Sequence, residues 1–323
     1  MPRLLLAVHL GLAFCCLSVQ AQSAPKHDPE LQNRFVRGIE ESSERLQHIS
    51  FRARCVYIGT KSASGKADTR EYEIGIRGPY GLQTGVRDGI TFVEARNDAY
   101  AFMLHRSGAK NSLQFLEAVG AAPVVDRKIA ANAQQARAMA LAAYYLWTEP
   151  LAQVVERESF TINRVYAVQS EQREVVRVEF DYGIDDPSQK IHDRFTDGYV
   201  VCDPARQWTV KEYGAVHHNL NNDYIATIKT VLEHGDTVED LPIATKITQT
   251  MASAGDGYTS ESTINLSILS RELPNEELYL SYYGLPEPHF ERSWFGAWVW
   301  YLIAGIVCLA IAVGIFKRRE AGM

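Results

Sequence analysis

Residues 176–182 read Val-Arg-Val-Glu-Phe-Asp-Tyr, in which every second side chain is apolar and those between are charged. Successive side chains of a strand point to opposite faces, so this period of two predicts a strand that buries one face and leaves the other in water. Residues 50–58 and 71–77 show similar alternation. Strands of this kind are typical of an antiparallel sheet with one covered face.

Turn signals separate strand-like segments along most of the chain. Gly78-Pro79 and Asp88-Gly89 both favour chain reversal, and the second, flanked by apolar residues, is a good hairpin signal. Helical spacing of apolar residues is confined to residues 28–49, where Asp28 can cap the first turn, and residues 126–147. This order predicts an α+β domain built on a large antiparallel β-sheet, with an N-terminal helix and an inserted helix.

The first residues have the organisation of a secretory signal peptide. Arg3 gives a positive start, residues 4–17 are almost wholly apolar, and Val19-Gln20-Ala21 fits the small-x-small rule for cleavage. The apolar run is too short to span a membrane comfortably. We therefore expect a signal peptide at residues 1–21 and one extracytoplasmic domain at residues 22–273.

An apolar stretch near the C-terminus predicts one transmembrane helix. Residues 294–316 contain no Asp, Glu, Lys, Arg or His. At 1.5 Å per residue they reach roughly 34 Å, enough for a hydrocarbon core of about 30 Å. Trp294, Trp298 and Trp300 stand at one end of this stretch, where such rings favour the membrane interface.

A basic tail gives the expected orientation. Lys317, Arg318 and Arg319 follow the apolar stretch at once, and basic residues stay on the cytoplasmic side of a membrane. We therefore expect a single-pass protein of the cell membrane with its N-terminal domain in the periplasm. Residues 274–293 would form a Pro-containing stalk, and residues 317–323 a short cytoplasmic tail.

Charge and cysteine content narrow the function. The chain carries 33 Lys and Arg against 39 Asp and Glu, a net charge of −6, whereas a nucleic-acid partner requires a basic surface. No spacing suited to a metal and no cofactor motif occurs. The expected domain contains Cys55 and Cys202. An exported pair of this kind can form a disulfide, and the alternative is two buried free thiols.

No catalytic motif stands out in the sequence. A Gly-x-Ser-x-Gly elbow, a phosphate-binding Gly-rich loop and a His-Glu-x-x-His helix are all missing. His217-His218 is the most suggestive cluster, but adjacent histidines on a strand point to opposite faces and cannot hold one ion. We interpret them as part of a solvated turn beside residues 219–222. The sequence therefore favours a protein that is not an enzyme.

The order of elements over residues 28–269 resembles the periplasmic lipoprotein-carrier (LolA/LolB-like) fold. Residues 198–213, Gly-Tyr-Val-Val-Cys-Asp-Pro-Ala-Arg-Gln-Trp-Thr-Val-Lys-Glu-Tyr, look like the strand–turn–strand of many such domains. The resemblance implies a curved half-barrel sheet closed on one side by helices, with a cavity for acyl chains or a protein-contact surface. It brings no catalytic set with it.

The C-terminal region carries a second resemblance. Residues 278–288, Leu-Tyr-Leu-Ser-Tyr-Tyr-Gly-Leu-Pro-Glu-Pro, followed by a span and a basic tail, look like the end of exported proteins of planctomycete-type bacteria. Pro286-Glu287-Pro288 before a span is also similar to a PEP-CTERM sorting signal, which implies exosortase processing. The alternative is a Pro-stiffened stalk on a permanent anchor.

Three functions fit these observations. The first is an anchored binding domain for a lipid, a lipoprotein or another hydrophobic ligand. The second is an envelope sensor or scaffold that binds another protein, and the third is a hydrolase with unrecognised residues. For the first, the alternation predicts an apolar cavity lined by inward-facing side chains: Tyr72, Ile74, Ile76, Val176, Val178 and Phe180.

Overall fold

The computed structural model describes residues 26–61, 67–108, 110–119, 128–170, 173–186, 191–255 and 257–290. Thirteen of the described strands form one antiparallel sheet, and two short strands form a separate hairpin. The large sheet contains β1 (Ser50–Lys61), β2 (Ala67–Arg77), β3 (Tyr80–Arg87), β4 (Ile90–Arg96), β5 (Tyr100–Ser107), β6 (Lys110–Ala118), β9 (Phe160–Ser170), β10 (Arg173–Asp186), β11 (Ile191–Asp203), β12 (Thr209–Asn219), β13 (Tyr224–Val238), β14 (Leu241–Ser253) and β15 (Thr259–Ser270).

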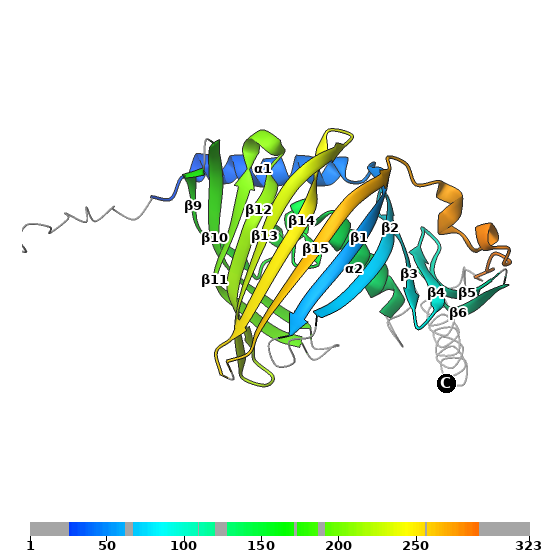
Figure 1. The fold of residues 1–323 in the computed structure, drawn as a ribbon. Helices are drawn as coiled ribbons and strands as arrows, with labels where there is room; N and C mark the ends of the chain where they lie inside the picture. The colour runs from blue at the N-terminus through cyan, green and yellow to red at the C-terminus, as the bar shows by residue number, and fades with distance from the viewer. Residues whose placement is uncertain are drawn as a thin grey trace, which may run out of the picture.

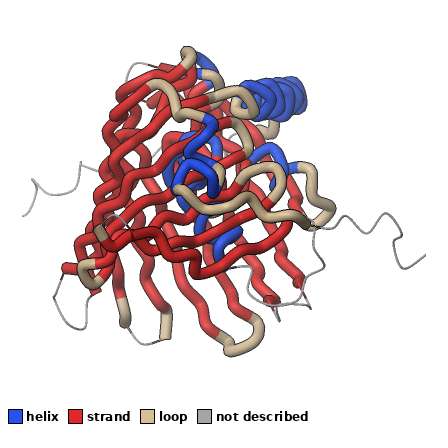
Figure 2. Tube along the Cα trace, turned by 90° about the vertical axis from the view of Figure 1, so that its right-hand side faces the viewer, coloured by secondary structure: helices blue, strands red, loops and turns tan. Residues whose placement is uncertain are grey.

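The strand order joins the two ends of the domain in the middle of the sheet. It runs β6-β5-β4-β3-β2-β1-β15-β14-β13-β12-β11-β10-β9. The chain therefore starts in the middle with β1 and advances to the edge strand β6. It then resumes at the opposite edge with β9 and returns to the middle with β15. The segment between β6 and β9 holds the inserted helices α2 (Lys128–Ala140) and α3 (Leu151–Val155) and lies inside the curve of the strands (Figures 1 and 2). This arrangement is the curved, unclosed antiparallel sheet that the sequence predicts.

Alternation determines which face of each strand is buried. Val176, Val178 and Phe180 are fully buried on β10, whereas Glu179 between them pairs with Arg164 at 2.6 Å on the outer face. The expected reversal at Asp88-Gly89 is the β3–β4 turn, in which both residues have positive φ, 52° and 77°. Two positive φ values define the hairpin turn that matches the twist of its strands. These sequence predictions are confirmed.

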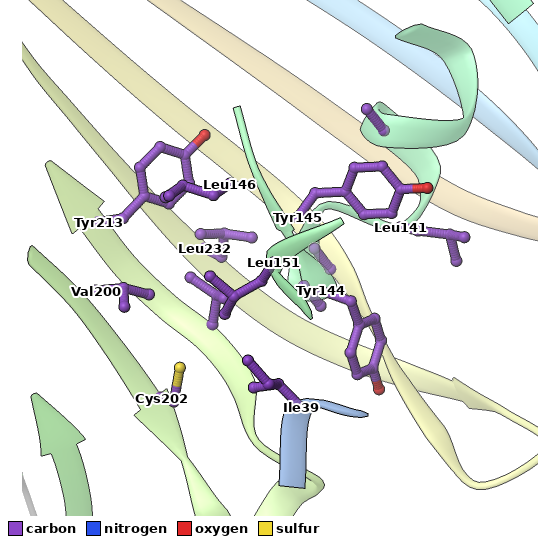
Figure 3. Close-up of a cluster of buried hydrophobic side chains, with 14 of the residues drawn as sticks. Ile39, Leu141, Tyr144, Tyr145, Leu146, Leu151, Val200, Cys202, Tyr213 and Leu232 are labelled. Carbon is purple, nitrogen blue, oxygen red and sulfur yellow. The ribbon is translucent and has the colours of Figure 1, made fainter. Parts of the chain in front are cut away.

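The N-terminal helix α1 (Pro29–Arg45) lies across one end of β9–β14 (Figure 1). Asp28 caps it as expected, because the N–H of Leu31 donates to its Oδ1 at 3.0 Å. The buried face of α1, including Phe35 and Ile39, packs into the main core with α3 and the inner face of the sheet. Figure 3 shows Ile39 beside Leu151, Val200 and Cys202 in this core.

The inserted helix is shorter than the sequence predicts. α2 ends at Ala140 instead of Trp147, and the chain continues through a 3-10 turn, η1 (Ala142–Tyr144), into a hairpin of β7 (Tyr145–Leu146) and β8 (Glu149–Pro150). Regular helix would spread these large side chains around its circumference. The turn and hairpin instead bury Tyr144, Tyr145 and Leu146 in the main core.

The residues after β15 pack on the outer face of the sheet. Two 3-10 turns, η3 (Asn275–Leu278) and η4 (Leu280–Tyr283), lie beside β3–β6 (orange in Figure 1). They form a second core with outward-facing residues of β3–β5, namely Leu82, Val93, Ala95, Tyr100, Phe102 and Leu104. The segment after β15 contributes Leu273, Leu278, Leu280 and Tyr283 to this core. Residues 274–290, which the sequence predicts as part of a stalk, therefore extend the folded domain.

One short segment differs from the sequence interpretation. His217 and His218 belong to β12 and not to a turn, and Asp193 lies on the neighbouring strand β11. The Nε2 atom of His217 lies 3.0 Å from Asp193 on one face, while that of His218 lies 3.1 Å from the Thr196 hydroxyl. Polar side chains that pair across neighbouring strands resemble loop residues in a single sequence, which explains the difference.

The membrane-related predictions concern residues outside the described ranges. These are the signal peptide at 1–21, the span at 294–316 with Trp294, Trp298 and Trp300, and the tail with Lys317, Arg318 and Arg319. Within the described ranges, no helix has the length and apolar character that a membrane span requires.

Candidate functional site

A cavity of about 670 Å³ occupies the part of the concave face that the core leaves unfilled. Its walls come from the inner faces of β1–β4 and β12–β15, and α2 and the β7–β8 turn complete them. The lining residues are Tyr57, Gly59, Asp68, Arg70, Tyr72, Gln83, Arg87, Phe92, Glu94, Gln135, Ala138, Met139, Ala142, Trp147, Thr148, Tyr213, Thr230, Ile247, Gln249, Tyr258, Ser260, Glu261, Ser262 and Ile264. This volume lies within the range of roughly 300–1,000 Å³ that is typical of small-molecule sites.

The inner face changes from apolar to polar along each strand. On β2, Ile76 and Ile74 are fully buried in the main core, Tyr72 is half-buried, and Arg70 is exposed. On β15, the inward side chains change in the same way from Leu266 and Ile264 to Ser262 and Ser260. The cavity therefore has an apolar, aromatic inner part and a polar rim.

Trp147 forms the boundary between the filled core and the cavity. Its ring lies against Phe195 with centroids 4.1 Å apart and stacks near Tyr182 at 6.0 Å, while it also lines the cavity. Trp147 occupies the two-residue turn between β7 and β8, and its φ is therefore 56°. A positive φ is uncommon for a bulky residue. Neighbouring Tyr213 is buried, and this burial raises the pKa of its hydroxyl. The inner end of the cavity is therefore lined by buried aromatic side chains.

Arg137 fastens α2 over the cavity. Its Nε donates to the carbonyl of Gly78, in the β2–β3 turn, at 3.1 Å, and its guanidinium contacts the Tyr145 hydroxyl in the β7–β8 hairpin. Burial lowers the pKa of Arg137 to about 10, so the side chain is charged at neutral pH. These contacts place the Ala138 and Met139 side chains along the cavity wall.

Arginine and carboxylate side chains alternate at the rim. Arg70 pairs with Asp68 at 2.6 Å, which together with the Tyr72 hydroxyl raises the pKa of Arg70. Arg87 lies over the Phe92 ring, 5.5 Å from its centroid. Glu261 also lines the cavity. Glu94, which is 6% exposed, lines it further in, opposite Gln83 and at the level of Ile74. A ligand with a hydrocarbon part and a polar or charged end matches this distribution.

Of the six residues predicted to line a cavity, Tyr72 does so. The structure places Ile74, Ile76, Val176, Val178 and Phe180 on the predicted inner face, but fully buried in the main core. There α1, α3 and the β7–β8 hairpin fill the space, so the cavity lies further along the strands.

Cys55 and Cys202 are both buried free thiols, so the structure has the second of the two alternatives and not a disulfide. Cys55 lies on β1 and Cys202 on β11, with four strands between them. At about 4.8 Å per strand, this separates them by roughly 24 Å along the sheet, whereas a disulfide needs Cα atoms within about 7 Å. Burial raises the pKa of both thiols, that of Cys55 to about 12.

Several cavity residues have no clear signal in the sequence. Ser260, Ser262 and Gln249 look like solvent-facing strand positions, because polar residues on a sheet are ordinarily on its wet face. Trp147 and Met139 lie in the segment predicted as a regular helix. Only the curvature of the sheet and the path of the inserted segment bring these five side chains to one cavity.

Among the described residues, no group of three or more His, Cys, Asp and Glu side chains is arranged to hold a metal ion. Of the two adjacent histidines, His217 contacts a carboxylate, that of Asp193. The His217 imidazole also stacks on the Phe195 ring, with centroids 4.8 Å apart. Neither residue lines the cavity.

Comparisons with known proteins give likenesses in structure alone. No protein-family model and no curated protein matches the chain. A putative outer membrane lipoprotein-sorting protein domain from Vibrio parahaemolyticus has 10% identity and a TM-score of 0.40, over 76% of this chain and 97% of its own. A DUF1329 family protein from Desulfovibrio piger ATCC 29098 has 10% identity and a TM-score of 0.40, over 78% of this chain and 98% of its own.

Likenesses of this size carry no conclusion about the fold family or the ligand of this chain. The class of the domain follows from its own geometry: a curved antiparallel sheet, helices against its concave face, and a cavity between them.

Proposed function

We propose that this protein binds an amphiphile, either a lipid or the acyl chain of a lipoprotein, in the cavity on the concave face of its sheet. The observation that carries the proposal is the gradient within one cavity, from Trp147, Met139 and Ile264 inside to Arg70 and Arg87 at the rim. A purely apolar ligand would make no polar contact with the charged rim, and a purely polar one would leave the apolar inner wall uncovered.

The cavity is large enough for such binding to be useful. Each buried methylene contributes about 0.8 kcal/mol, so about ten methylenes supply up to roughly 8 kcal/mol before the cost of association. The helices and hairpin that form the inner wall belong to the main core, so little reorganisation of that wall is required. A cavity that exists before binding favours affinity.

The test is a titration of the purified full chain with cis-parinaric acid, a fluorescent fatty acid, followed by energy transfer from tryptophan. Ser262→Trp fills the cavity from β15, whose inward position it shares with Ile264. Ser267→Trp is the matched control, because Ser267 is exposed on the same strand between Leu266 and Ile268, which both face the core.

We expect saturable binding by the native chain and by Ser267→Trp, and at least a tenfold loss of affinity in Ser262→Trp. The control also measures partition of the probe into any lipid that accompanies the protein. Equal binding by the two variants, or no saturable binding by the native chain, would exclude the cavity as an amphiphile site.

The proposal includes location and the lack of catalysis. The signal peptide and the single span that the sequence predicts, with the basic residues after that span, support a domain held at the outer face of the cell membrane, where lipids and lipoproteins are present. The absence of a recognised catalytic motif in the sequence supports a binding protein over a hydrolase. Membrane fractionation and protease treatment of intact spheroplasts test the location: the chain should sediment with membranes and its domain should be cleaved from outside.

A further inference from the structure

Strands β2 and β3 separate before either of them ends. Their ladder runs from the pair Arg77 and Tyr80 to the pair Tyr72 and Gly85. Beyond it, residues 67–71 of β2 remain paired with β1, and residues 86–87 of β3 remain paired with β4. These two unjoined ends, here named the fork, interrupt the sheet next to the cavity.

The sequence gives a physical reason for the fork. If the ladder continued in the same register, Arg70 would stand directly opposite Arg87. Both side chains line the cavity on the inner face, and like charges opposite each other in a sheet are destabilising. Gly85 is the last residue of β3 that pairs with β2. A Cβ there would meet the Phe92 ring at 2.7 Å and the Tyr72 ring at 3.0 Å, so a larger residue would clash with the cavity wall.

The fork lies between the cavity and the outer face. Four residues, Arg70, Tyr72, Arg87 and Phe92, line the cavity and also a second hollow of about 760 Å³ that includes outward-facing residues of β1–β3. The outer hollow is flanked by exposed apolar side chains, with Val86 66% exposed and Leu269 53% exposed. The wall between the two hollows is therefore formed by side chains and not by a backbone ladder.

One of the arginines at the fork has no carboxylate partner within the described ranges, although Glu94 and Glu261 also line the cavity. Asp68 pairs with Arg70 at 2.6 Å, and Glu71 pairs with Arg54 at 2.7 Å on the outer face. Arg87 has no carboxylate within ion-pair distance among the described side chains, and its contact there is the Phe92 ring. An anionic group between Arg70 and Arg87 would neutralise the repulsion that separates the strands and accept charge-assisted hydrogen bonds from both.

We propose that the fork is a lateral opening of the cavity, in which Arg70 and Arg87 bind the anionic head group of an amphiphile whose hydrocarbon chain lies against Tyr72 and Phe92. This inference rests on the proposed function and adds the ligand's charge and its route. The shared chemistry of the head group is an anionic oxygen, either a carboxylate or a phosphate.

Closing the fork tests the route. In Glu71→Cys/Val86→Cys, the two thiols are joined across the fork with dibromobimane, and release of cis-parinaric acid to acceptor vesicles is followed by stopped flow. Val86→Cys/Thr91→Cys is the matched control, because residues 86 and 91 are partners in the intact β3–β4 ladder. We expect cross-linking to slow release at least tenfold in the first variant and to leave the second unchanged. Equal release rates with and without the cross-link in both variants would overturn the lateral opening.

Arg87→Gln tests the head group. We expect the affinity for cis-parinaric acid to fall about tenfold, as for the loss of one charge-assisted contact, and that for the neutral parinaryl alcohol to stay the same. Competition by a lysophosphatidic acid against competition by a fatty acid distinguishes phosphate from carboxylate. Equal affinity of native chain and variant for the acid would overturn the role of Arg87. Failure of the native chain to bind either probe would instead overturn the proposed function itself.

Discussion

Removing one hydroxyl should release the C-terminal segment from the outer face of the sheet. Tyr100, on β5, donates to the carboxylate of Glu287 and accepts from the N–H of Leu280 at 3.0 Å. Desolvation acts to raise the pKa of Glu287, but hydrogen bonds from Ser281 and Tyr100 outweigh it and lower that pKa. Tyr100→Phe keeps the ring packing and deletes both hydrogen bonds.

The expected cost follows from the two partners left behind. The N–H of Leu280 is buried and loses its acceptor, which costs about 1–2 kcal/mol, and the partly exposed carboxylate of Glu287 keeps Ser281 and loses about 1 kcal/mol. We expect a total near 2–3 kcal/mol, expressed as local opening of residues 273–290 more than as loss of the whole fold.

Amide hydrogen exchange resolved by mass spectrometry measures this directly. Peptides from residues 273–290 should exchange roughly 30-fold to 150-fold faster in Tyr100→Phe, with little change in β10–β13. Tyr279→Phe is the control, since the Tyr279 hydroxyl donates to exposed Asp98 at 3.0 Å and should matter much less. Unchanged exchange of residues 273–290 in Tyr100→Phe would refute the conclusion that this segment belongs to the folded domain.

Three further outcomes follow from burial and capping. Burial, helped by the nearby charges of Arg206 and Lys211, lowers the pKa of His234 to about 4, so from pH 6.5 down to pH 4 the unfolded chain takes up a proton that the folded chain does not. Stability should fall over this window by about 3 kcal/mol, and in denaturant titrations His234→Gln should lack this part of the pH dependence. Asp28→Ala should lower stability by about 1 kcal/mol through the lost helix cap, whereas Asp28→Asn should cost little; equal losses would contradict a capping role. Cys55 and Cys202 should resist thiol reagents in the native state and both react after unfolding without a reductant; peptide mapping that finds them joined would contradict the free thiols.

The sequence contains more information about the sheet than about the cavity. Alternation on β10 identifies Val178 and Phe180 as inward-facing, and Asp88-Gly89 locates a hairpin, because both patterns depend on neighbours in the chain. Whether an inward-facing residue meets core or cavity depends on the inserted segment, which ends its helix at Ala140 to bury aromatic rings. No local pattern reports that choice.

The outer-face packing and the fork depend on relationships between distant segments. Leu278 and Leu280 stand in a Pro-containing segment that looks like a connector, but they meet β3–β5, which place apolar residues on the outer face as well. Similarly, Arg70 and Arg87 stand in two different strand-like segments, and in each segment alone an arginine near the end of a strand indicates a solvent-exposed side chain. Only the register between β2 and β3 brings the two like charges toward each other.

Photo-cross-linking with a diazirine-labelled fatty acid tests the central claim, that an amphiphile lies in the concave cavity, most directly. After saturation, illumination and peptide mapping of the full chain, the label should be found between residues 135 and 142, at the end of α2 and the start of η1, and on β15 between residues 259 and 264. Ser262→Trp should abolish it and Ser267→Trp should not. Label confined to exposed apolar side chains of β6, such as Phe115, or equal labelling of the two variants, would contradict the account.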